Sequence, residues 1–111
     1  MFGNSESKIQ KLAEKKNAEK IIPFLRDKNP ATRLAALDGL GACGNVDAYN
    51  ALLPFVRDSD PTTREHAIRA LGALGDGNAR THIMYQRGKE DNPAVKQAIE
   101  DALKRINATQ V

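Results

Sequence analysis

An internal repeat of about 31 residues governs the architecture that this chain can adopt. One copy begins at Arg26 and reads RDKNPATRLAALDGLGACGN, and the next begins at Arg57 and reads RDSDPTTREHAIRALGALGD. A third, more divergent copy, KEDNPAVKQAIEDALKRIN, begins at Lys89 after a one-residue insertion. A unit this short cannot bury its own apolar face, so the repeat predicts a stack in which each unit packs on its neighbours.

Each copy opens and closes with residues that favour the ends of a helix. Asn or Asp followed by Pro places a capping oxygen at the N-cap and Pro at the first helical position, where its missing N–H costs nothing. The copies close on Gly or Asn, which tolerate the left-handed conformation that follows many helices. The start signals are Asn29-Pro30, Asp60-Pro61 and Asn92-Pro93, and the end signals are Gly44, Gly75 and Asn107.

Between these signals, apolar residues recur with the spacing of one helix face. The stripe consists of Leu37 and Leu40, then Ala67, Ile68, Leu71 and Leu74, then Val95, Ala98, Ile99, Ala102, Leu103 and Ile106. These three segments are the second, or inner, helices of their pairs. First helices are expected at residues 17–26, 46–57 and 79–88, the last with a thinner stripe of Ile83, Met84 and Tyr85.

The sequence therefore predicts an all-α fold, an α-α superhelix or α-solenoid of about three helix pairs in one domain spanning residues 1–111. A capping helix is expected at residues 5–15, followed by pair one at 17–44, pair two at 46–75 and pair three at 78–107. The composition agrees, because aromatic residues are only 5% of the chain and Trp is absent. Strands, in contrast, are rich in aromatic and β-branched residues.

Charge and cysteine content narrow the class of protein. The chain has 17 Lys and Arg residues against 14 Asp and Glu residues, a net charge of +3. This balance mildly favours an acidic partner but falls well short of a nucleic-acid-binding footprint. Cys43 is the single cysteine, which excludes a disulfide framework, and it aligns with Leu74, so we expect a small core residue and not a nucleophile. Without a signal-peptide pattern or a membrane-length apolar run, we expect a cytoplasmic protein with no membrane partner.

Three short motifs in the second copy carry a family resemblance. They are Leu-Leu-Pro-Phe-Val-Arg-Asp at 52–58, Asp-Pro-x-x-Arg at 60–64 and Ala-Leu-Gly-Ala-Leu-Gly-Asp at 70–76. The chain resembles HEAT repeats over roughly residues 17–107, in particular the short bacterial and archaeal form named after phycobilin lyases. A proline often bends the first helix of such repeats, and Pro23 and Pro54 stand at equivalent positions.

The resemblance also implies a ladder that links neighbouring repeats, built from an acidic residue in the turn and a basic residue later in the same copy. The matching residues are Asp27 with Arg33, Asp58 with Arg64, and Glu90 with Lys96 as a conservative equivalent.

The third copy departs from this pattern. Tyr85 stands where a proline is expected, and Gln86 and Arg87 replace the apolar Phe55 and Val56. Terminal repeats are usually atypical because one face meets water, and we interpret the change in this way. A polar opening that docks a partner is the alternative.

Enzymes built on HEAT-like repeats have signatures that are missing from this sequence. The deoxyhypusine hydroxylase type holds two irons with His-Glu dipeptides on several repeats, whereas this chain has a single Glu65-His66 and one further histidine, His82. The alkylpurine DNA glycosylase type uses a basic groove with aromatic residues, whereas the outward positions Asp38, Arg69 and Asp101 alternate in sign. Nothing marks the chromophore site of a bilin lyase. We expect neither catalysis nor a cofactor or metal.

The remaining candidate is a binding surface on the inner helices. Their outward faces should align into one shallow concave surface when the repeats stack. Its predicted partner-binding residues are His66, Arg69, Gln97, Asp101 and Arg105. The sequence thus favours a monomeric, non-enzymatic scaffold that binds a protein or peptide. Two alternatives stay open: an accessory subunit of a lyase-like or other enzyme complex that handles a small ligand, and a nucleic-acid-binding module, which the mixed charges disfavour.

Overall fold

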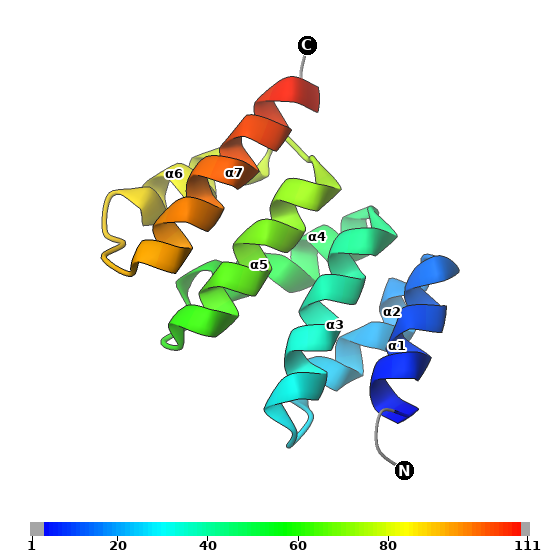
Figure 1. Cartoon of the computed structure of the whole chain (residues 1–111). Helices are drawn as coiled ribbons and strands as arrows, with labels where there is room; N and C mark the ends of the chain where they lie inside the picture. Colours follow the sequence, from blue (N-terminus) through cyan, green and yellow to red (C-terminus); the bar gives the residue numbers. More distant parts are fainter. Residues whose placement is uncertain (1–3, 110–111) are drawn as a thin grey trace.

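The computed structural model describes residues 4–109 and is helical throughout, with no strand in that range (Figure 1). The elements are α1 (Asn4–Glu14), α2 (Ala18–Ile21), the 3₁₀ helix η1 (Ile22–Arg26), α3 (Pro30–Cys43), α4 (Val46–Leu52), the 3₁₀ helix η2 (Leu53–Arg57), α5 (Pro61–Leu74), α6 (Ala79–Arg87) and α7 (Pro93–Thr109). The predicted all-α solenoid of helix pairs is confirmed. No helix of the described chain is long and apolar enough to cross a membrane.

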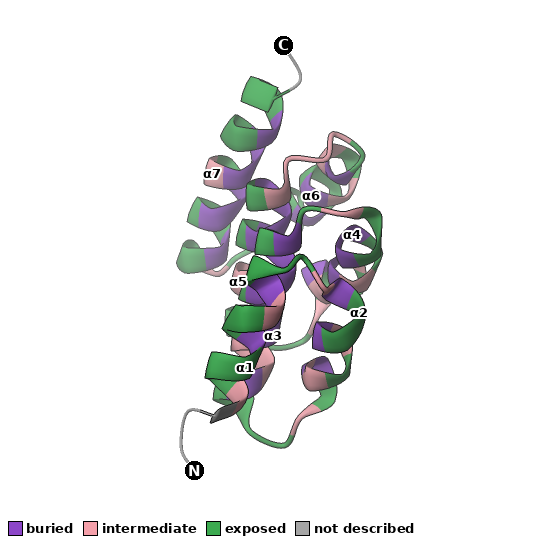
Figure 2. Cartoon of the chain, turned by 90° about the vertical axis from the view of Figure 1, so that its right-hand side faces the viewer, coloured by how far each residue is buried: buried purple, intermediate pink, exposed green. Residues whose placement is uncertain are grey.

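The helices form two layers. Helices α1, α3, α5 and α7 pack side by side in chain order, and α2 with η1, α4 with η2, and α6 lie behind them (Figure 1). Seen from the side, the buried residues lie between the two layers (Figure 2). Helix α3 packs on α1 and α5, and α5 packs on α3 and α7, so the stack is held by contacts between consecutive repeats.

The capping residues that start the inner helices act as the sequence predicts. The side chains of Asn29, Asp60 and Asn92 each accept a hydrogen bond from a backbone N–H in the first turn of α3, α5 and α7. These bonds satisfy donors that have no partner within the helix. Local sequence alone thus determines where each inner helix begins.

The inner helices end where the sequence predicts in pairs one and two but not in pair three. Gly44 and Gly75 adopt the left-handed conformation after α3 and α5, with φ of 67° and 77°. The predicted end at Asn107 is wrong, because α7 continues to Thr109. The Thr109 hydroxyl contacts the carbonyl oxygens of Ile106 and Gly75, at 2.8 and 3.0 Å, and so ties this extra turn to the end of α5.

The first helices of pairs one and two contain a proline, and that of pair three does not. Pro23 and Pro54 lie at the start of η1 and η2, where the α-helix tightens into a 3₁₀ helix. Proline has no N–H to donate and its ring crowds the preceding turn, so the α-helical pattern ends there. With Tyr85 in place of proline, α6 stays α-helical to Arg87. The α-helix thus gives way to a 3₁₀ helix at both prolines, and this change of helix type does not occur in pair three.

Two glycines of the repeated Leu-Gly-Ala motif allow the inner helices to approach closely. A Cβ atom on Gly41 would lie 2.9 Å from the Cα of Ala70, and one on Gly72 would lie 2.8 Å from the Cα of Ala102. No side chain fits at such distances from a neighbouring backbone. The motif therefore sets the spacing of α3, α5 and α7.

The apolar core is continuous from α1 to α7. Cys43 is buried within it, and burial raises the pKa of its thiol. A thiol held protonated in an apolar setting is inert, which agrees with the predicted core role. Met84 and Tyr85, which the sequence places in the apolar stripe of α6, are instead exposed, and Tyr85 takes the position of Pro23 and Pro54, which are exposed as well.

Candidate functional site

The inner-helix ridge, defined as His66, Arg69, Gln97, Asp101 and Arg105, lies on the outward side of α5 and α7. Three of its members, Arg69, Gln97 and Asp101, are joined by hydrogen bonds, and Arg105 lies near them. Arg69 Nη1 donates to Asp101 Oδ2 at 3.1 Å, which joins α5 to α7, and Gln97 Nε2 donates to Asp101 Oδ1 at 3.0 Å. Arg105 borders the same small hollow as Arg69 and Asp101, about 70 Å³ in volume. The ridge has room there for water and not for an organic ligand.

Whereas Arg69 pairs with α7, His66 pairs with a residue of α3, outside the predicted set. Its Nδ1 lies 2.8 Å from Oδ1 of Asp38 in α3. Arg69 also reaches Glu65 one turn earlier, with 3.4 Å between Nε and Oε2. The ridge is therefore a chain of polar contacts that runs from α3 across α5 to α7.

Arg69 and Asp101 on the ridge are paired with each other but open to solvent. The hydrogen bond from Arg69, followed by that from Gln97, lowers the pKa of Asp101, and the bond to Asp101 raises the pKa of Arg69. Both side chains are more than two-fifths exposed, at 42% and 43%. Exposed pairs of this kind contribute little to stability, so they can exchange partners at low cost.

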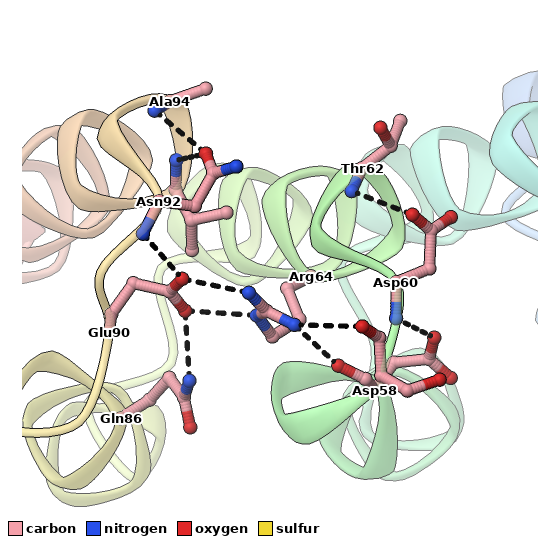
Figure 3. Close-up of polar contacts among 10 residues, drawn as sticks. Asp58, Asp60, Thr62, Arg64, Gln86, Glu90, Asn92 and Ala94 are labelled. Atoms are coloured by element: carbon pink, nitrogen blue, oxygen red, sulfur yellow. Dashed lines mark hydrogen bonds and ion pairs between the residues drawn. The ribbon is translucent and has the colours of Figure 1, made fainter.

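A second polar cluster lies at the turns between the layers and centres on Arg64 (Figure 3). Its Nε and Nη2 donate to the two carboxylate oxygens of Glu90, at 2.9 and 2.8 Å. Its Nη1 donates to the backbone carbonyls of Asp58 and Ser59, at 2.9 and 3.2 Å. One guanidinium thus joins the turn before its own helix to the corresponding turn of the next repeat.

Glu90 is the most constrained carboxylate of this cluster. Besides Arg64, it accepts hydrogen bonds from Gln86 Nε2 at 2.8 Å and from the Asn92 N–H at 3.1 Å. The hydrogen bonds from Arg64 and Gln86 lower its pKa from 4.5 to about 2, against the opposing effect of burial. A carboxylate so surrounded stays ionised and structural.

The other ladder residues do not form the predicted side-chain pairs of Asp27 with Arg33 and Glu90 with Lys96. Arg33 Nη1 donates to the backbone carbonyls of Asp27 and Lys28, at 2.7 and 3.1 Å. Glu90 is occupied by Arg64 of the preceding repeat, and Lys96 is exposed. Arg33 and Arg64 therefore both bond the backbone of the turn before their own helix, and Arg64 also bonds a side chain of the following repeat.

Gln86 corrects one interpretation of the sequence. The third copy was expected to be polar because it faces water, yet Gln86 is buried and bonded to Glu90. Sequence reasoning missed this network, although a Gln and a Glu four residues apart on one side of a helix end are a usable signal.

Within residues 4–109, no three His, Cys, Asp or Glu side chains lie close enough to hold a metal ion. The two side chains of the Glu65-His66 dipeptide have different partners, because Glu65 pairs with Arg69 and His66 with Asp38.

The family-model comparison agrees with this geometry. A model described as HEAT repeats matches residues 18–104, which is most of the chain. The chain belongs to the HEAT-repeat family. HEAT repeats are commonly scaffolds for protein interactions and are typically non-enzymatic. A comparison with curated protein sequences gives no match.

Proposed function

We propose that this HEAT-repeat protein is a non-enzymatic scaffold that binds a protein or peptide on the inner-helix ridge. The observation that carries the proposal is the line of half-exposed polar contacts across α3, α5 and α7, from Asp38 and His66 to Arg69 and Asp101. None of these residues belongs to the apolar core, so their polar side chains are not explained by core packing.

The mixed signs of the ridge favour a protein over a polyanion. A nucleic acid requires positive groups in register, whereas the ridge alternates Asp38, Arg69 and Asp101. Complementary charges of both signs give orientation and specificity more than affinity. The exposed pairs offer both donors and carboxylates, and a partner can replace either member of a pair.

A role as accessory subunit that handles a small ligand has less support at this surface. Small-ligand sites are usually hollows of about 300–1,000 Å³. The hollow at the ridge, beside Arg69, Asp101 and Arg105, measures about 70 Å³. At Arg69, Asp101 and Arg105, so small a hollow fits a macromolecular partner better than a small ligand.

The test is affinity capture from native cell lysate, with the wild-type chain and a ridge variant as baits. The variant combines His66→Ala, Arg69→Glu and Arg105→Glu. The control, Lys20→Glu with Arg26→Glu, changes the formal charge equally at exposed positions of the first-helix layer. We expect the ridge variant to lose the captured partner and the control to keep it. Equal capture by all three baits would exclude the ridge as the binding site.

A further inference from the structure

The other layer of the solenoid carries an exposed apolar patch on α6. Tyr85 and Met84 are 57% and 48% exposed, two of the largest exposed apolar side chains in the described chain. Tyr85 occupies the position of Pro23 and Pro54, which are also exposed, so pair three has a large aromatic side chain where the other two pairs have a proline. The patch is thus specific to the third helix pair.

Two cations stand over the Tyr85 ring. The guanidinium carbon of Arg57, at the end of η2, and the ammonium nitrogen of Lys89, after α6, each lie 5.1 Å from the ring centroid. At this distance both cations are attracted by the ring, and the contacts hold the ring in place. Neither cation forms an ion pair with a carboxylate of residues 4–109. Both side chains are exposed, so these two positive charges face solvent.

The acidic residues nearby are mostly engaged elsewhere. Glu90 is buried against Arg64, Glu100 pairs with Arg87 at 3.0 Å, and the Asp58 carboxylate accepts the Asp60 N–H. Asp91 is exposed beside Lys89 and is the one nearby carboxylate that these contacts leave open to solvent. Arg57 and Lys89, the two charged side chains that stand over the Tyr85 ring, are thus both positive and not paired with these carboxylates.

A hollow of about 300 Å³ adjoins this charged ring, between η2 and α6. Its lining combines three apolar residues with three polar ones: Leu53, Pro54 and Val56, and Asn50, Arg57 and His82. This volume is at the lower limit for small-ligand pockets, about 300 Å³, and suits one or two side chains. Arg57 belongs to both the hollow and the Tyr85 contact, so the two features form one surface.

We propose that this α6 surface docks an acidic peptide segment of a partner protein that carries an apolar anchor side chain. The anchor enters the hollow against Leu53 and Val56, and flanking carboxylates pair with Arg57 and Lys89. The exposed Tyr85 ring contacts the peptide between them. This site is separate from the inner-helix ridge and does not depend on it.

Peptide chemistry fits the surface better than a nucleic acid does. Only two unpaired cations flank Tyr85, whereas phosphate-backbone binding gains its affinity from many cations in a row. The apolar residues of the hollow beside them offer nothing to a phosphate. Apolar anchoring in a pocket with charged residues around it is the usual arrangement for peptide and protein hot spots.

The test uses the full chain and a fluorescein-labelled peptide with a central Leu-Phe pair between runs of Glu. Binding is followed by fluorescence anisotropy and by amide chemical-shift changes. We expect saturable binding that weakens with added salt, with shift changes centred on His82, Tyr85 and Lys89. A peptide with Lys in place of Glu, and one with Ala-Ala in place of Leu-Phe, should each bind about tenfold more weakly or worse.

Variants separate the surface from general electrostatics. Arg57→Glu with Lys89→Glu should weaken peptide binding about tenfold or more, and Tyr85→Ser should weaken it without changing charge. Lys11→Glu with Lys20→Glu makes the same charge change at exposed sites far from α6 and should leave binding unchanged. Amide spectra show whether each variant is folded. Absent binding, equal loss in the control, shift changes elsewhere, or tighter binding of a single-stranded oligonucleotide than of the peptide would each overturn the proposal.

Discussion

Arg64 and Glu90 face each other through two parallel hydrogen bonds, yet Arg33 and Asp58, their counterparts one repeat earlier, form no ion pair in the described chain. Aspartate is one methylene shorter than glutamate, and the Asp58 carboxylate is already bonded to the Asp60 N–H. A hollow of about 300 Å³ remains beside Arg33 and Asp58. Equivalent positions thus form an ion pair between the second and third repeats, which we call a closed link, and none between the first and second, an open link.

Removing Arg64 should destabilise the protein strongly. In Arg64→Ala, the Glu90 carboxylate, whose side chain is 1% exposed, loses its cation and keeps only neutral donors. We expect a loss of about 2–4 kcal/mol in the free energy of unfolding, measured by urea denaturation. Arg69→Ala removes an exposed arginine and should cost less than about 1 kcal/mol. Similar losses in the two variants would contradict the different roles assigned to them.

Glu90 should make stability depend on pH in the acidic range. Its pKa is lowered to about 2 in the folded state, below the ordinary value of 4.5. The stabilising effect is therefore complete above pH 4.5 and is lost as the pH falls towards 2. Thermal melts across this range should show a steep decline for the wild type and a shallower one for Glu90→Gln. Parallel curves would show that Glu90 does not contribute.

Lengthening Asp58 should close the open link. In Asp58→Glu, the longer side chain can reach Arg33 and still accept the N–H of residue 60, as Glu90 does with Asn92. We expect a gain of up to about 1 kcal/mol, because the site is partly exposed. Asp27→Glu is the matched control. The Asp27 carboxylate accepts a hydrogen bond only from the Asn29 N–H, so lengthening this side chain should not stabilise the protein. A stabilised control, or a destabilised Asp58→Glu, would count against this mechanism.

What the sequence predicts here divides along physical lines. Asn29, Asp60, Pro54 and Gly75 act through their own backbone, so their effects are visible in a short stretch of sequence. The contacts of Glu90 depend instead on how one repeat is placed on another. No local rule pairs it with Arg64, because the two residues come from different repeats.

The ridge shows the same division. The helical spacing predicts that His66, Arg69 and Asp101 point outward, and all three are partly or fully exposed. It does not predict that His66 meets Asp38, because that contact depends on the offset between α3 and α5. That offset follows from the close approach at Gly41 and Ala70, a packing detail across two helices.

Gly72 should be intolerant of a side chain. A Cβ atom there would lie 2.8 Å from the Cα of Ala102, so Gly72→Ala must push α5 and α7 apart. We expect a destabilisation of about 1–3 kcal/mol in chemical denaturation. Gly88→Ala is the control, because its nearest neighbour would be the Tyr85 carbonyl at 3.5 Å and its backbone is already α-helical. That variant should be neutral or slightly stabilised, and an equal cost at both glycines would refute the packing role.

A charge swap on the ridge tests recognition while keeping the net charge unchanged. Arg69→Asp combined with Asp101→Arg retains an opposite pair between α5 and α7, but it reverses the field that a partner meets. The pair is exposed, so the swap should change the free energy of unfolding by less than about 1 kcal/mol, part of it from repulsion by Glu65. If the ridge recognises its partner by charge, capture from lysate should fail although the thermal melt is nearly unchanged. Either single substitution alone should also impair capture. Normal capture by the swapped protein would mean that the partner does not recognise this pair, and would shift the binding site away from the ridge.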